Sequence, residues 1–372
     1  MKNDRLRIAW DNSIAGQDHA GTGMYASRLV SWLRETQDVD LEMFEGPQRT
    51  RGKRSPISLG KQVIRQLFWY HGQFPRALRR AHFDLIHCPA FVVPLWCPCP
   101  SVVTVHDLTA LIFPRHFDPR WRMYVNAMMP HVLRLVSAVI CVSANTKQDL
   151  LKFYKVSHAK VHVVHNGVDH QRFHPGVTLD HGWARQAGLR DGYLLHVGTF
   201  SYRKNIPTLL RAIAHLRSKG KWGTRQLVLA GSERSGMKGA QEIYETLREL
   251  DLESSVIVTG HVPDEHVPGL YAHASVLVMP SLYEGFGFPV LESMAVGTPV
   301  IASDTSSLPE VGGDAAIYFP PRDELALASA IEDVLEKKAV ADELQRKGLV
   351  RAAQFSWQRC AEETVKVYRS IV

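Results

Sequence analysis

Short apolar runs alternate with longer segments of helical periodicity along the whole chain. Runs of this kind are typical of strands buried in parallel sheets, and their alternation with helices predicts βα units. Strands are expected at residues 6–10, 41–44, 85–88, 102–105, 139–142 and 161–164, and again at 193–197, 227–231, 256–262 and 274–279. The pattern therefore predicts an α/β protein built on doubly wound parallel sheets, which bind ligands where their strands end.

Helix signals lie between these strands. A helix is expected at about 24–34, and Ser143 is a good N-cap for a later one. Pro289 suits the first turn of a helix over 290–296. The final segment, 357–372, has a helical apolar period as well.

The stretch from 281 to 292 reads Ser-Leu-Tyr-Glu-Gly-Phe-Gly-Phe-Pro-Val-Leu-Glu and lies between a predicted strand and a predicted helix. The N–H groups of this glycine-containing loop, together with the helix N-terminus, would favour an anion such as a sugar diphosphate. Glu284 is placed to accept hydrogen bonds from ligand hydroxyls, and Glu292 lies eight residues later, in the predicted helix. A plain strand-to-helix turn, with Glu284 as a capping acid, fits the loop equally well.

The spacing Glu284-Gly-Phe-Gly-Phe-Pro-Val-Leu-Glu292 resembles the donor-site signature of the retaining glycosyltransferases of family 4. The similarity continues through 293–303 and 307–311. The resemblance implies a GT-B fold, in which two Rossmann-like domains face one another across a cleft. It also implies a nucleotide-sugar donor, with Glu284 at the sugar and Glu292 at the ribose. The implied donor-binding loop comprises Gly285, Phe286 and Gly287.

The loop over 15–23 follows the first predicted strand and ends in Ala-Gly-Thr-Gly. A doubly wound sheet places a ligand loop at this position, although a flexible turn fits these residues equally well. The resemblance implies that Gly21 and Gly23 approach the donor diphosphate.

The predicted strand over 102–105 is followed directly by His106 and Asp107. A His beside an Asp is often only a structural pair, and the two residues by themselves indicate no more than that. In family 4 this strand end carries a His that faces the donor sugar across the cleft. The resemblance therefore implies that role for His106 and makes Asp107 a secondary candidate.

Arg203 and Lys204 occupy a loop between a predicted strand and the following helix. An Arg fork and a Lys point charge would clamp a diphosphate there, although such residues are commonly plain surface charge. Many family 4 members place the Arg directly after the glycine, where this chain has Thr199, whereas a common subgroup has Arg-Lys-Asn in tandem, as this chain does. The resemblance further implies that the backbone near His261 and Val262 borders the nucleobase.

At 372 residues the chain is long for one hydrophobic core and sufficient for two domains. We expect an N-terminal acceptor-side domain over 1–170, a polar linker over 171–190 and a donor-binding domain over 191–355. By resemblance to GT-B proteins, a helix over 356–372 is expected to cross back to the N-terminal domain.

The net charge of +7 is unevenly distributed. Up to His165 there are 22 Lys/Arg and 12 Asp/Glu, a net of +10, whereas the remainder has 22 against 25, a net of −3. Nine of the basic residues lie between Glu45 and Asp84 with no acidic residue among them. Interleaved with these are the aromatic residues Phe68, Trp69, Tyr70 and Phe74.

Basic residues beside aromatic ones suit an anionic membrane surface, RNA or a solvated face over a partly buried helix. No RNA-binding signature accompanies them. We therefore expect reversible association with an anionic membrane through residues 47–80, and no nucleic-acid partner.

The first residues are polar and lead directly into a strand, so no signal peptide is expected, and no apolar run approaches the roughly 20 residues of a membrane span. Five cysteines form no disulfide framework, and Cys97-Pro-Cys99 lacks the second pair that a zinc site needs. Asp38-Val-Asp40 spells the DxD of other glycosyltransferases, but it precedes an early strand, and we interpret it as a surface turn. We expect a cytoplasmic location at the inner face of the cell membrane, no cofactor and no metal.

With the resemblance, these features predict a retaining, metal-independent hexosyltransferase in the biosynthesis of a surface polysaccharide such as O-antigen or exopolysaccharide. The acceptor is expected to be a glycan or a polyprenyl-diphosphate-linked oligosaccharide. GDP-mannose is the first donor candidate, ahead of UDP-glucose and a UDP-N-acetylhexosamine. A sugar-nucleotide epimerase of the same architecture and a non-catalytic module that binds membrane or RNA stay open. The expected catalytic residues are His106, Arg203, Lys204 and Glu284.

Overall fold

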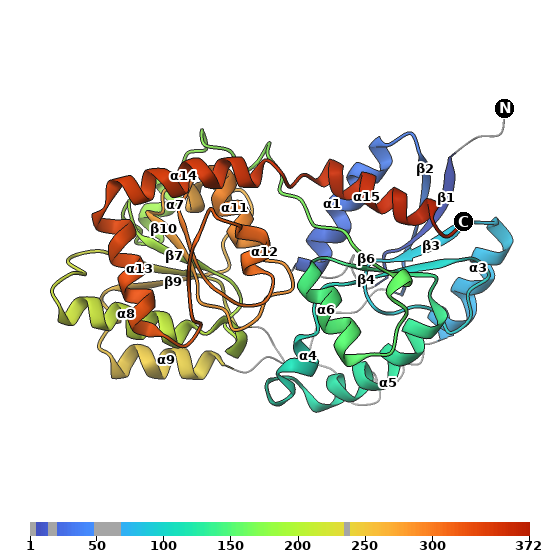
Figure 1. Ribbon diagram of the computed structural model, residues 1–372, viewed down its shortest axis with the longest axis horizontal. Helices are drawn as coiled ribbons and strands as arrows, with labels where there is room; N and C mark the ends of the chain where they lie inside the picture. The colour runs from blue at the N-terminus through green and yellow to red at the C-terminus, as the bar shows by residue number, and fades with distance from the viewer. Residues whose placement is uncertain (1–4, 14–20, 48–67, 234–238) are drawn as a thin grey trace. The chain divides into compact units, whose positions relative to one another are not determined.

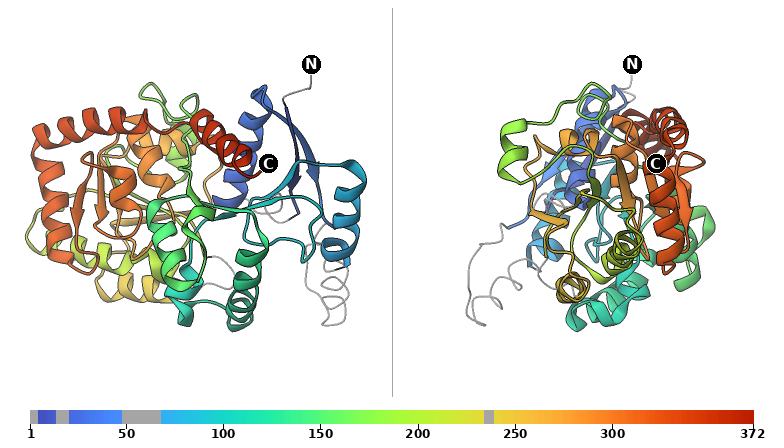
Figure 2. Two further views of the ribbon diagram at one scale, coloured as in Figure 1. Left: turned by 45° about the vertical axis from the view of Figure 1, so that its right-hand side comes forward. Right: turned by 90° about the vertical axis from the view of Figure 1, so that its left-hand side faces the viewer.

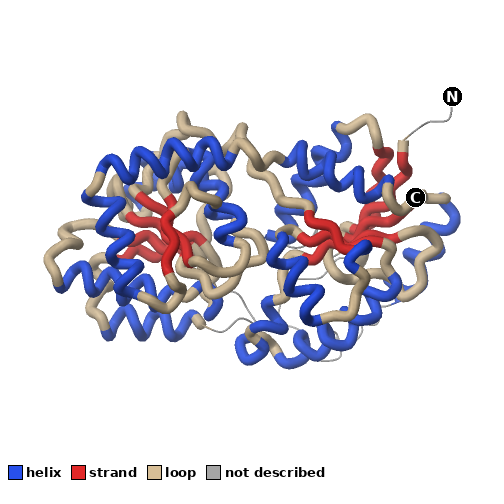
Figure 3. Tube along the Cα trace, viewed as in Figure 1, coloured by secondary structure: helices blue, strands red, loops and turns tan. Residues whose placement is uncertain are grey.

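The structure, a computed structural model, describes residues 5–13, 21–47, 68–233 and 239–372. Contacts divide the chain into two compact units, each assembled from separated segments. Unit 1 comprises Met1–Leu108, Met123–Gly167 and Trp357–Val372, and unit 2 comprises Thr109–Arg122 and Val168–Ser356. Figure 3 shows the strands of each unit, in red, gathered at its centre.

Unit 1 is built on a parallel six-stranded sheet in the order β2-β1-β3-β4-β5-β6. Its strands are β1 (Leu6–Asp11), β2 (Val39–Phe44), β3 (Leu85–Cys88), β4 (Ser101–Val105), β5 (Ala138–Cys141) and β6 (Val161–Val163). Every residue of β3, β4 and β5 is buried, as expected for strands that are covered on both faces.

Helices cover both faces of this sheet, as Figures 1 and 2 show. One face carries α1 (Gly21–Glu35) and α15 (Trp357–Arg369), and the other carries α3 (Phe74–Ala81), α5 (Pro119–Leu135) and α6 (Ala144–Phe153). The short turns η2 (Trp69–Gln73) and η4 (His158–Lys160) precede α3 and β6. The predicted N-cap of α6 is confirmed, because the Ser143 Oγ accepts a hydrogen bond of 3.0 Å from the N–H of Thr146.

Unit 2 is built on a second parallel six-stranded sheet, in the order β12-β11-β10-β7-β8-β9. Its strands are β7 (Leu194–Val197), β8 (Leu227–Ala230), β9 (Val256–Gly260), β10 (Val276–Met279), β11 (Val300–Ser303) and β12 (Ile317–Phe319). The chain moves outward from β7 to β9, returns to β10 beside β7, and then moves outward to β12. This is the strand order of a Rossmann fold.

Two groups of helices pack on the sheet of unit 2 (Figure 1). One group is α8 (Ile206–Ser218), α9 (Ala240–Glu249) and α13 (Glu324–Glu336). The other is α10 (Val267–Ala272), α11 (Phe288–Val296), α12 (Leu308–Gly312) and α14 (Lys338–Ala352). The remaining helical segments are α4 (Thr109–Ile112), η3 (Pro114–His116), α7 (His181–Gln186) and η5 (Tyr202–Lys204).

Each sheet reverses its winding direction at one point, between β1 and β3 in unit 1 and between β7 and β10 in unit 2. The connections on the two sides of such a point leave opposite faces of the sheet, so the loops diverge at the carboxyl ends of the strands. β7 ends at Val197 and β10 ends at Met279. The loops that carry Arg203, Lys204 and Glu284 therefore begin at the reversal point of unit 2.

The ten strands expected from the sequence all have counterparts, whereas β11 and β12 were not predicted. β12 has only three residues, which is too short for a pattern to distinguish it from a loop. The strand expected over 256–262 ends at Gly260, where a φ of +68° turns the chain. α1 begins at Gly21, three residues before the expected start at 24.

The grouping of residues differs from the expected division at two places. Thr109–Arg122 belongs to unit 2 rather than to the domain expected over 1–170, and there the His116 ring stacks on Tyr202 with centroids 3.7 Å apart. The linker expected over 171–190 contains α7 and also belongs to unit 2. Asp180 caps α7, because its Oδ1 accepts hydrogen bonds from the first N–H groups of that helix.

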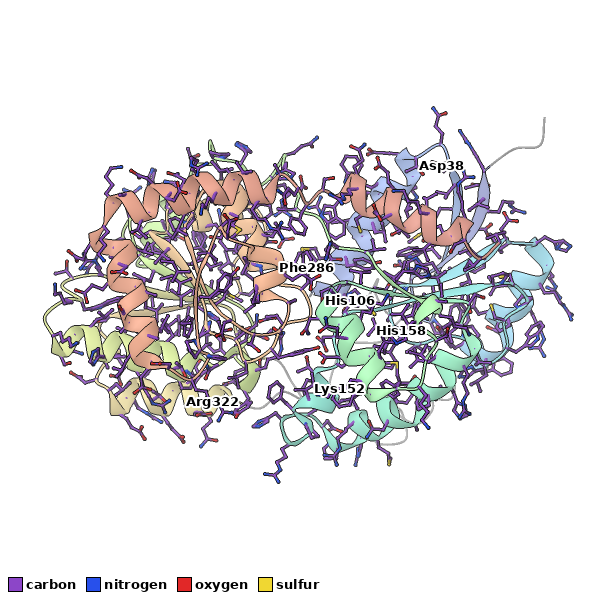
Figure 4. The ribbon with its side chains drawn as sticks, viewed as in Figure 1. Asp38, His106, Lys152, His158, Phe286 and Arg322 are labelled. Carbon is purple, nitrogen blue, oxygen red and sulfur yellow. The ribbon has the colours of Figure 1, made fainter. Side chains whose placement is uncertain are left out.

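The terminal helix α15 belongs to unit 1 and is fixed there by polar contacts. The Tyr368 hydroxyl lies 2.5 Å from Nδ1 of the buried His87. Arg369 donates from Nη2 to Oδ1 of Asp38 at 2.6 Å, which gives the first acid of the Asp-Val-Asp sequence an arginine partner. Asp38 is labelled in Figure 4.

A large hydrophobic core lies between the sheet of unit 2 and the helices α8, α9 and α13, with Leu229 of β8 fully buried within it. Leu229→Ala should lower the free energy of unfolding by about 2–5 kcal/mol, because it removes buried methyl groups and leaves a cavity. Leu325→Ala, at a leucine that is 56% exposed, is the matched control and should change it by less than about 0.5 kcal/mol. Urea titration of both variants tests this, and equal losses would contradict the assignment of the core.

Candidate active site

Three charged side chains meet at the reversal point of unit 2. The Glu284 Oε2 lies 2.5 Å from Nη1 of Arg203, and its Oε1 lies 2.7 Å from Nζ of Lys204. Glu284 is 6% exposed and Lys204 is 4% exposed. The sequence predicted all three residues as catalytic, and the fold brings them into direct contact although Glu284 lies 81 residues after Arg203 along the chain.

This buried cluster has two cations, Arg203 and Lys204, and one anion, Glu284, so it carries an excess of one positive charge. Burial by itself raises the pKa of Glu284, but Arg203, Lys204 and a hydrogen bond from Ser281 lower it to about 2. Burial lowers the pKa of Lys204, and Arg203 lowers it further, while Glu284 acts in the opposite direction. An anion bound beside the cluster would supply the missing negative charge.

Serine hydroxyls hold the Glu284 loop in place. Ser281 donates to Oε1 of Glu284 at 2.7 Å, and the Glu284 N–H donates to the Ser306 Oγ at 2.9 Å. The Ser307 Oγ lies 2.9 Å from the carbonyl oxygen of Glu284 and 2.7 Å from that of Phe286. The N–H, the carbonyl oxygen and the carboxylate of Glu284 therefore all have hydrogen-bond partners, and these fix the carboxylate beside Arg203 and Lys204.

Asn205 ties the cationic loop to the Glu284 loop. It adopts a left-handed conformation with φ +53°, and its Nδ2 donates to the carbonyl oxygen of Pro280 at 2.9 Å. The N–H of Leu282 donates to the carbonyl oxygen of Arg203 at 2.7 Å. On the outer side, Arg322 (labelled in Figure 4) donates from Nη2 to the Tyr202 hydroxyl at 3.4 Å.

Glycines line the carboxyl ends of β7, β8 and β9. A Cβ on Gly198 would lie 2.7 Å from Cε of Lys204, so the lysine reaches Glu284 only because position 198 has no side chain. A Cβ on Gly231 would lie 1.9 Å from the carbonyl oxygen of Gly198, and Gly231 donates its N–H to Gly260. Gly198 and Gly231 are therefore required by the close approach of neighbouring protein atoms, whereas a Cβ on Gly260 would meet no atom within 4 Å.

His196 of β7 was not assigned a role from the sequence, yet it lies directly behind the cluster. It is fully buried, and its Nδ1 lies 3.0 Å from the carbonyl oxygen of Val278. Burial and the nearby Lys204 lower the pKa of His196 to about 4, so the ring is neutral at physiological pH. Its position inside an apolar strand run gives no sequence signal, because buried histidines in strands are common.

The second glutamate of the signature has a different environment. Glu292 of α11 accepts a hydrogen bond of 2.9 Å at Oε2 from the hydroxyl of Tyr271, which fixes the orientation of the carboxylate. Tyr271 is fully buried, and burial raises the pKa of its hydroxyl well above the usual value. Tyr271 could not be identified from the signature, because it lies on α10, 21 residues before Glu292.

The remaining donor-site candidates of unit 2 are distributed around α11 and β9. Gly287 is the N-cap of α11 with φ +115°, a conformation that favours glycine. Phe286 (labelled in Figure 4) is 4% exposed and packs edge-on against Phe288 and Phe355, so its ring belongs to the interior. His261 is exposed, whereas Val262 is buried.

The candidates of unit 1 lie at the carboxyl end of its sheet. His106 follows β4, its Nε2 lies 2.9 Å from the carbonyl oxygen of Pro89, and its ring packs edge-on against Tyr25. Asp107 is exposed. Gly21 and Gly23 form the first turn of α1, whereas most of the predicted loop over 15–23 lies outside the described residues.

A second buried carboxylate marks the reversal point of unit 1 and was not predicted. Asp11 ends β1, and its Oδ1 accepts a hydrogen bond of 2.9 Å from the N–H of Ser13. The Tyr70 hydroxyl lies 2.8 Å from Oδ2 of Asp11 and 2.7 Å from the carbonyl oxygen of Val92. Burial raises the pKa of Asp11 although these hydrogen bonds act in the opposite direction.

Two family models match the chain. "Glycosyl transferases group 1" matches residues 183–351, and "Glycosyltransferase Family 4" matches residues 20–172. The O-antigen chain mannosyltransferase B of Escherichia coli is 30% identical over 94% of this chain and 96% of its own length. The MMP alpha-(1->4)-mannosyltransferase of Mycolicibacterium hassiacum is 32% identical over 94% of this chain and 88% of its own. The chain belongs to the family 4 glycosyltransferases.

Solved structures agree with the GT-B fold of this glycosyltransferase. A sucrose-phosphate synthase from Thermosynechococcus elongatus matches with a TM-score of 0.77 at 24% identity, over 98% of this chain and 99% of that one. Anabaena HepE, in a structure with UDP and glucose, matches with a TM-score of 0.73 at 20% identity, over 98% of this chain and 100% of that one. The two six-stranded parallel sheets are the Rossmann-like domains of that fold.

Two features are absent from the described residues of the glycosyltransferase. No helix among them is long and apolar enough to cross a bilayer. No group of three or more His, Cys, Asp or Glu in those same parts of the chain is arranged to hold a metal ion. Asp40, the second acid of the Asp-Val-Asp sequence, lies 4.0 Å from Nε of Arg7.

The pH dependence of stability should report the environment of His196. The pKa of His196 in the folded chain, about 4, lies below the usual value of 6.5, so the unfolded chain takes up a proton first as the pH falls. Stability should therefore decrease between pH 6.5 and pH 4, and His196 should contribute about 2 kcal/mol of the loss between pH 7.5 and pH 5. Urea unfolding at these two pH values is the measurement.

The variant His196→Gln removes this titration and should lose less stability than wild type over the same pH change. His158→Gln, at an exposed histidine labelled in Figure 4, is the control and should behave as wild type does. An unchanged pH dependence in His196→Gln would show that His196 is not the titrating group.

The charge imbalance of the cluster predicts an asymmetry between two variants. Glu284→Gln leaves Arg203 and Lys204 buried without a counter-ion and should cost about 3–5 kcal/mol, whereas Lys204→Met leaves one balanced pair and should cost less. Inorganic pyrophosphate should raise the melting temperature of Glu284→Gln more than that of Lys204→Met. Thermal denaturation with and without pyrophosphate tests this, and a larger shift for Lys204→Met would refute the charge argument.

Proposed function

We propose that this glycosyltransferase moves a hexose, with retention of configuration, from a nucleotide diphosphate sugar to a hydroxyl of a glycan or lipid-linked oligosaccharide. The buried cluster of Arg203, Glu284 and Lys204 is the observation that carries the proposal. Its excess positive charge matches a diphosphate, which must leave with developing negative charge.

In this proposal, two side chains and a helix N-terminus stabilise the negative charge of the departing diphosphate. Arg203 and Lys204 lie in η5, in the loop that follows β7, and the N-terminus of α11 follows the Glu284 loop. A fork of donors, a point charge and a helix dipole would together stabilise the departing diphosphate. The proposal therefore includes no cofactor and no divalent metal.

Binding of the donor would change the partners of Glu284. Both carboxylate oxygens are engaged by the two cations, and the pKa of about 2 keeps the group ionised. A diphosphate that draws Arg203 and Lys204 toward itself would free Glu284 to accept hydrogen bonds from sugar hydroxyls. Glu292, oriented by Tyr271, is the proposed partner of the ribose.

Glu284 does not act as a nucleophile in this proposal, so no glycosyl-enzyme intermediate forms and retention is assigned to substitution on one face of the sugar. A carboxylate with such a low pKa, fixed by two cations, is a weak base and a weak nucleophile. The anomeric carbon–oxygen bond to the diphosphate would break, and the acceptor oxygen would bond from the same face. The acceptor proton would pass to the departing phosphate oxygen, with His106 proposed to orient the sugar.

Mannose from GDP-mannose is the first donor candidate. The two relatives at 30% and 32% identity are named as mannosyltransferases, and the first of them acts on an O-antigen chain by its name. UDP-glucose and a UDP-N-acetylhexosamine are the next donors to test. We propose a polyprenyl-diphosphate-linked acceptor in surface polysaccharide synthesis, at the inner face of the cell membrane, because the first half of the chain carries a net charge of +10.

The donor should first be identified by a thermal-shift screen with GDP, UDP, ADP and their sugar conjugates, each with and without magnesium. A bound nucleotide stabilises the folded chain by RT ln(1 + [L]/Kd), so the melting temperature rises with the logarithm of its concentration once this exceeds the dissociation constant. Transfer of the matching sugar to a polyprenyl-diphosphate-linked acceptor would then be followed by NMR of the anomeric proton. Inverted product would contradict the retaining mechanism, and strict dependence on magnesium would contradict the metal-free one.

Lys204→Ala should lower turnover about 10²–10³-fold, as expected for loss of a charge that stabilises the transition state. Lys221→Ala is the matched control, because Lys221 also pairs with a glutamate (3.1 Å to Glu332) but is half exposed on the surface. This control should retain wild-type turnover. Near-normal rates for Lys204→Ala would remove Lys204 from the mechanism.

A further inference from the structure

Unit 1 exposes three large apolar side chains close to arginines. Phe68 is 62% exposed, Leu95 is 53% exposed and Trp96 is 49% exposed. Phe68 precedes η2, and the other two lie in the connection between β3 and β4. We call the surface that they form with the exposed arginines of α3 the Trp96 surface. Those arginines are Arg76, Arg79 and Arg80.

The exposed tip of the β3–β4 connection is held by specific contacts. The Tyr70 hydroxyl lies 2.7 Å from the carbonyl oxygen of Val92, and the Leu95 N–H donates to Nδ1 of His71 at 3.2 Å. The Arg79 guanidinium lies 5.9 Å from the centre of the Trp96 ring. Leu95 and Trp96 are therefore presented outward by a fixed backbone, and an arginine lies beside them.

The charge of this surface has one sign. Residues 68–81 contain three arginines and no acid, and residues 89–100 contain no charged residue. α3 buries Phe74 and Leu78 against the unit and leaves its arginines outside. An apolar tip beside a cationic helix complements a surface with an apolar layer beneath a layer of negative charge.

We propose that the Trp96 surface docks on an anionic lipid bilayer, with Leu95 and Trp96 inserted at the level of the headgroups and the arginines of α3 on lipid phosphates. This inference rests on the proposed lipid-linked acceptor and specifies how the enzyme reaches it. Tryptophan is favoured at the boundary between headgroups and acyl chains, and each nearby cation strengthens binding to anionic lipid. A single-stranded RNA would stack on aromatic rings but would gain nothing from Leu95, which has no π face.

The test is flotation of the full-length chain with phosphatidylcholine vesicles, with or without phosphatidylglycerol. Wild type should bind the anionic vesicles and not the neutral ones. Leu95→Ser combined with Trp96→Ser should abolish most binding, and Trp96→Phe should retain it. Arg76→Gln combined with Arg79→Gln should weaken binding about fivefold per arginine removed.

Leu325→Ser combined with Val350→Ser is the matched control, because it removes two apolar side chains of unit 2 that are 56% and 59% exposed. It should bind vesicles as wild type does. Undiminished binding by the Leu95/Trp96 variant would overturn the proposal, as would displacement of wild type from vesicles by oligo(U) RNA.

The same variants separate this inference from the proposed function. Thermal shifts with nucleotides need no vesicles and should be unchanged in the Leu95/Trp96 variant. Intact nucleotide binding without vesicle binding by wild type would refute the surface alone. Vesicle binding without any nucleotide shift would refute the proposed function alone.

Discussion

A carboxylate buried with two cations needs support from several sides, and the loops at the reversal point of unit 2 provide it. Ser281 and Ser306 contact the Glu284 side chain and its N–H, while Gly198 leaves the space through which Lys204 approaches. The strand order is what brings these loops together, because it is only at the reversal point that the segments after β7 and β10 become neighbours. The chemistry proposed for the enzyme thus depends on topology as much as on the charged residues.

The two carboxylates that are buried among the described residues show how the type of partner decides the pKa of a buried acid. Glu284 and Asp11 are both buried at a reversal point. Cations lower the pKa of Glu284 to about 2, whereas Asp11 has hydroxyl and amide donors and its pKa is raised by burial. Hydrogen bonds from neutral groups give the oxygens of Asp11 partners, but they do not offset the cost of removing a full negative charge from water. A charged ligand is therefore expected at Glu284 and a structural role is sufficient for Asp11.

Much of the fold was predictable from the sequence, because long apolar runs separated by helical periods define βα units without tertiary information. The two glutamates were found through a signature that is contiguous in sequence, and the cationic pair was found through a separate Arg-Lys-Asn tandem in another loop. Tyr271 and His196 were not, since their roles arise from contacts across the sheet and between helices. The placement of Thr109–Arg122 in unit 2 also escaped prediction, because nothing local distinguishes a segment that packs on another unit.

The position of α15 has a consequence for the order in which the protein can fold during synthesis. His87 is buried in the sheet of unit 1, and one of its ring nitrogens is bonded to Tyr368, 281 residues later in the chain. Until residues 357–369 have emerged from the ribosome, unit 1 lacks α15, and the His87 ring nitrogen lacks its partner. Unit 2 depends on no such late segment beyond Ser356. The C-terminal half of the enzyme can therefore reach its native packing first, and the unit that begins the chain is the last to be completed.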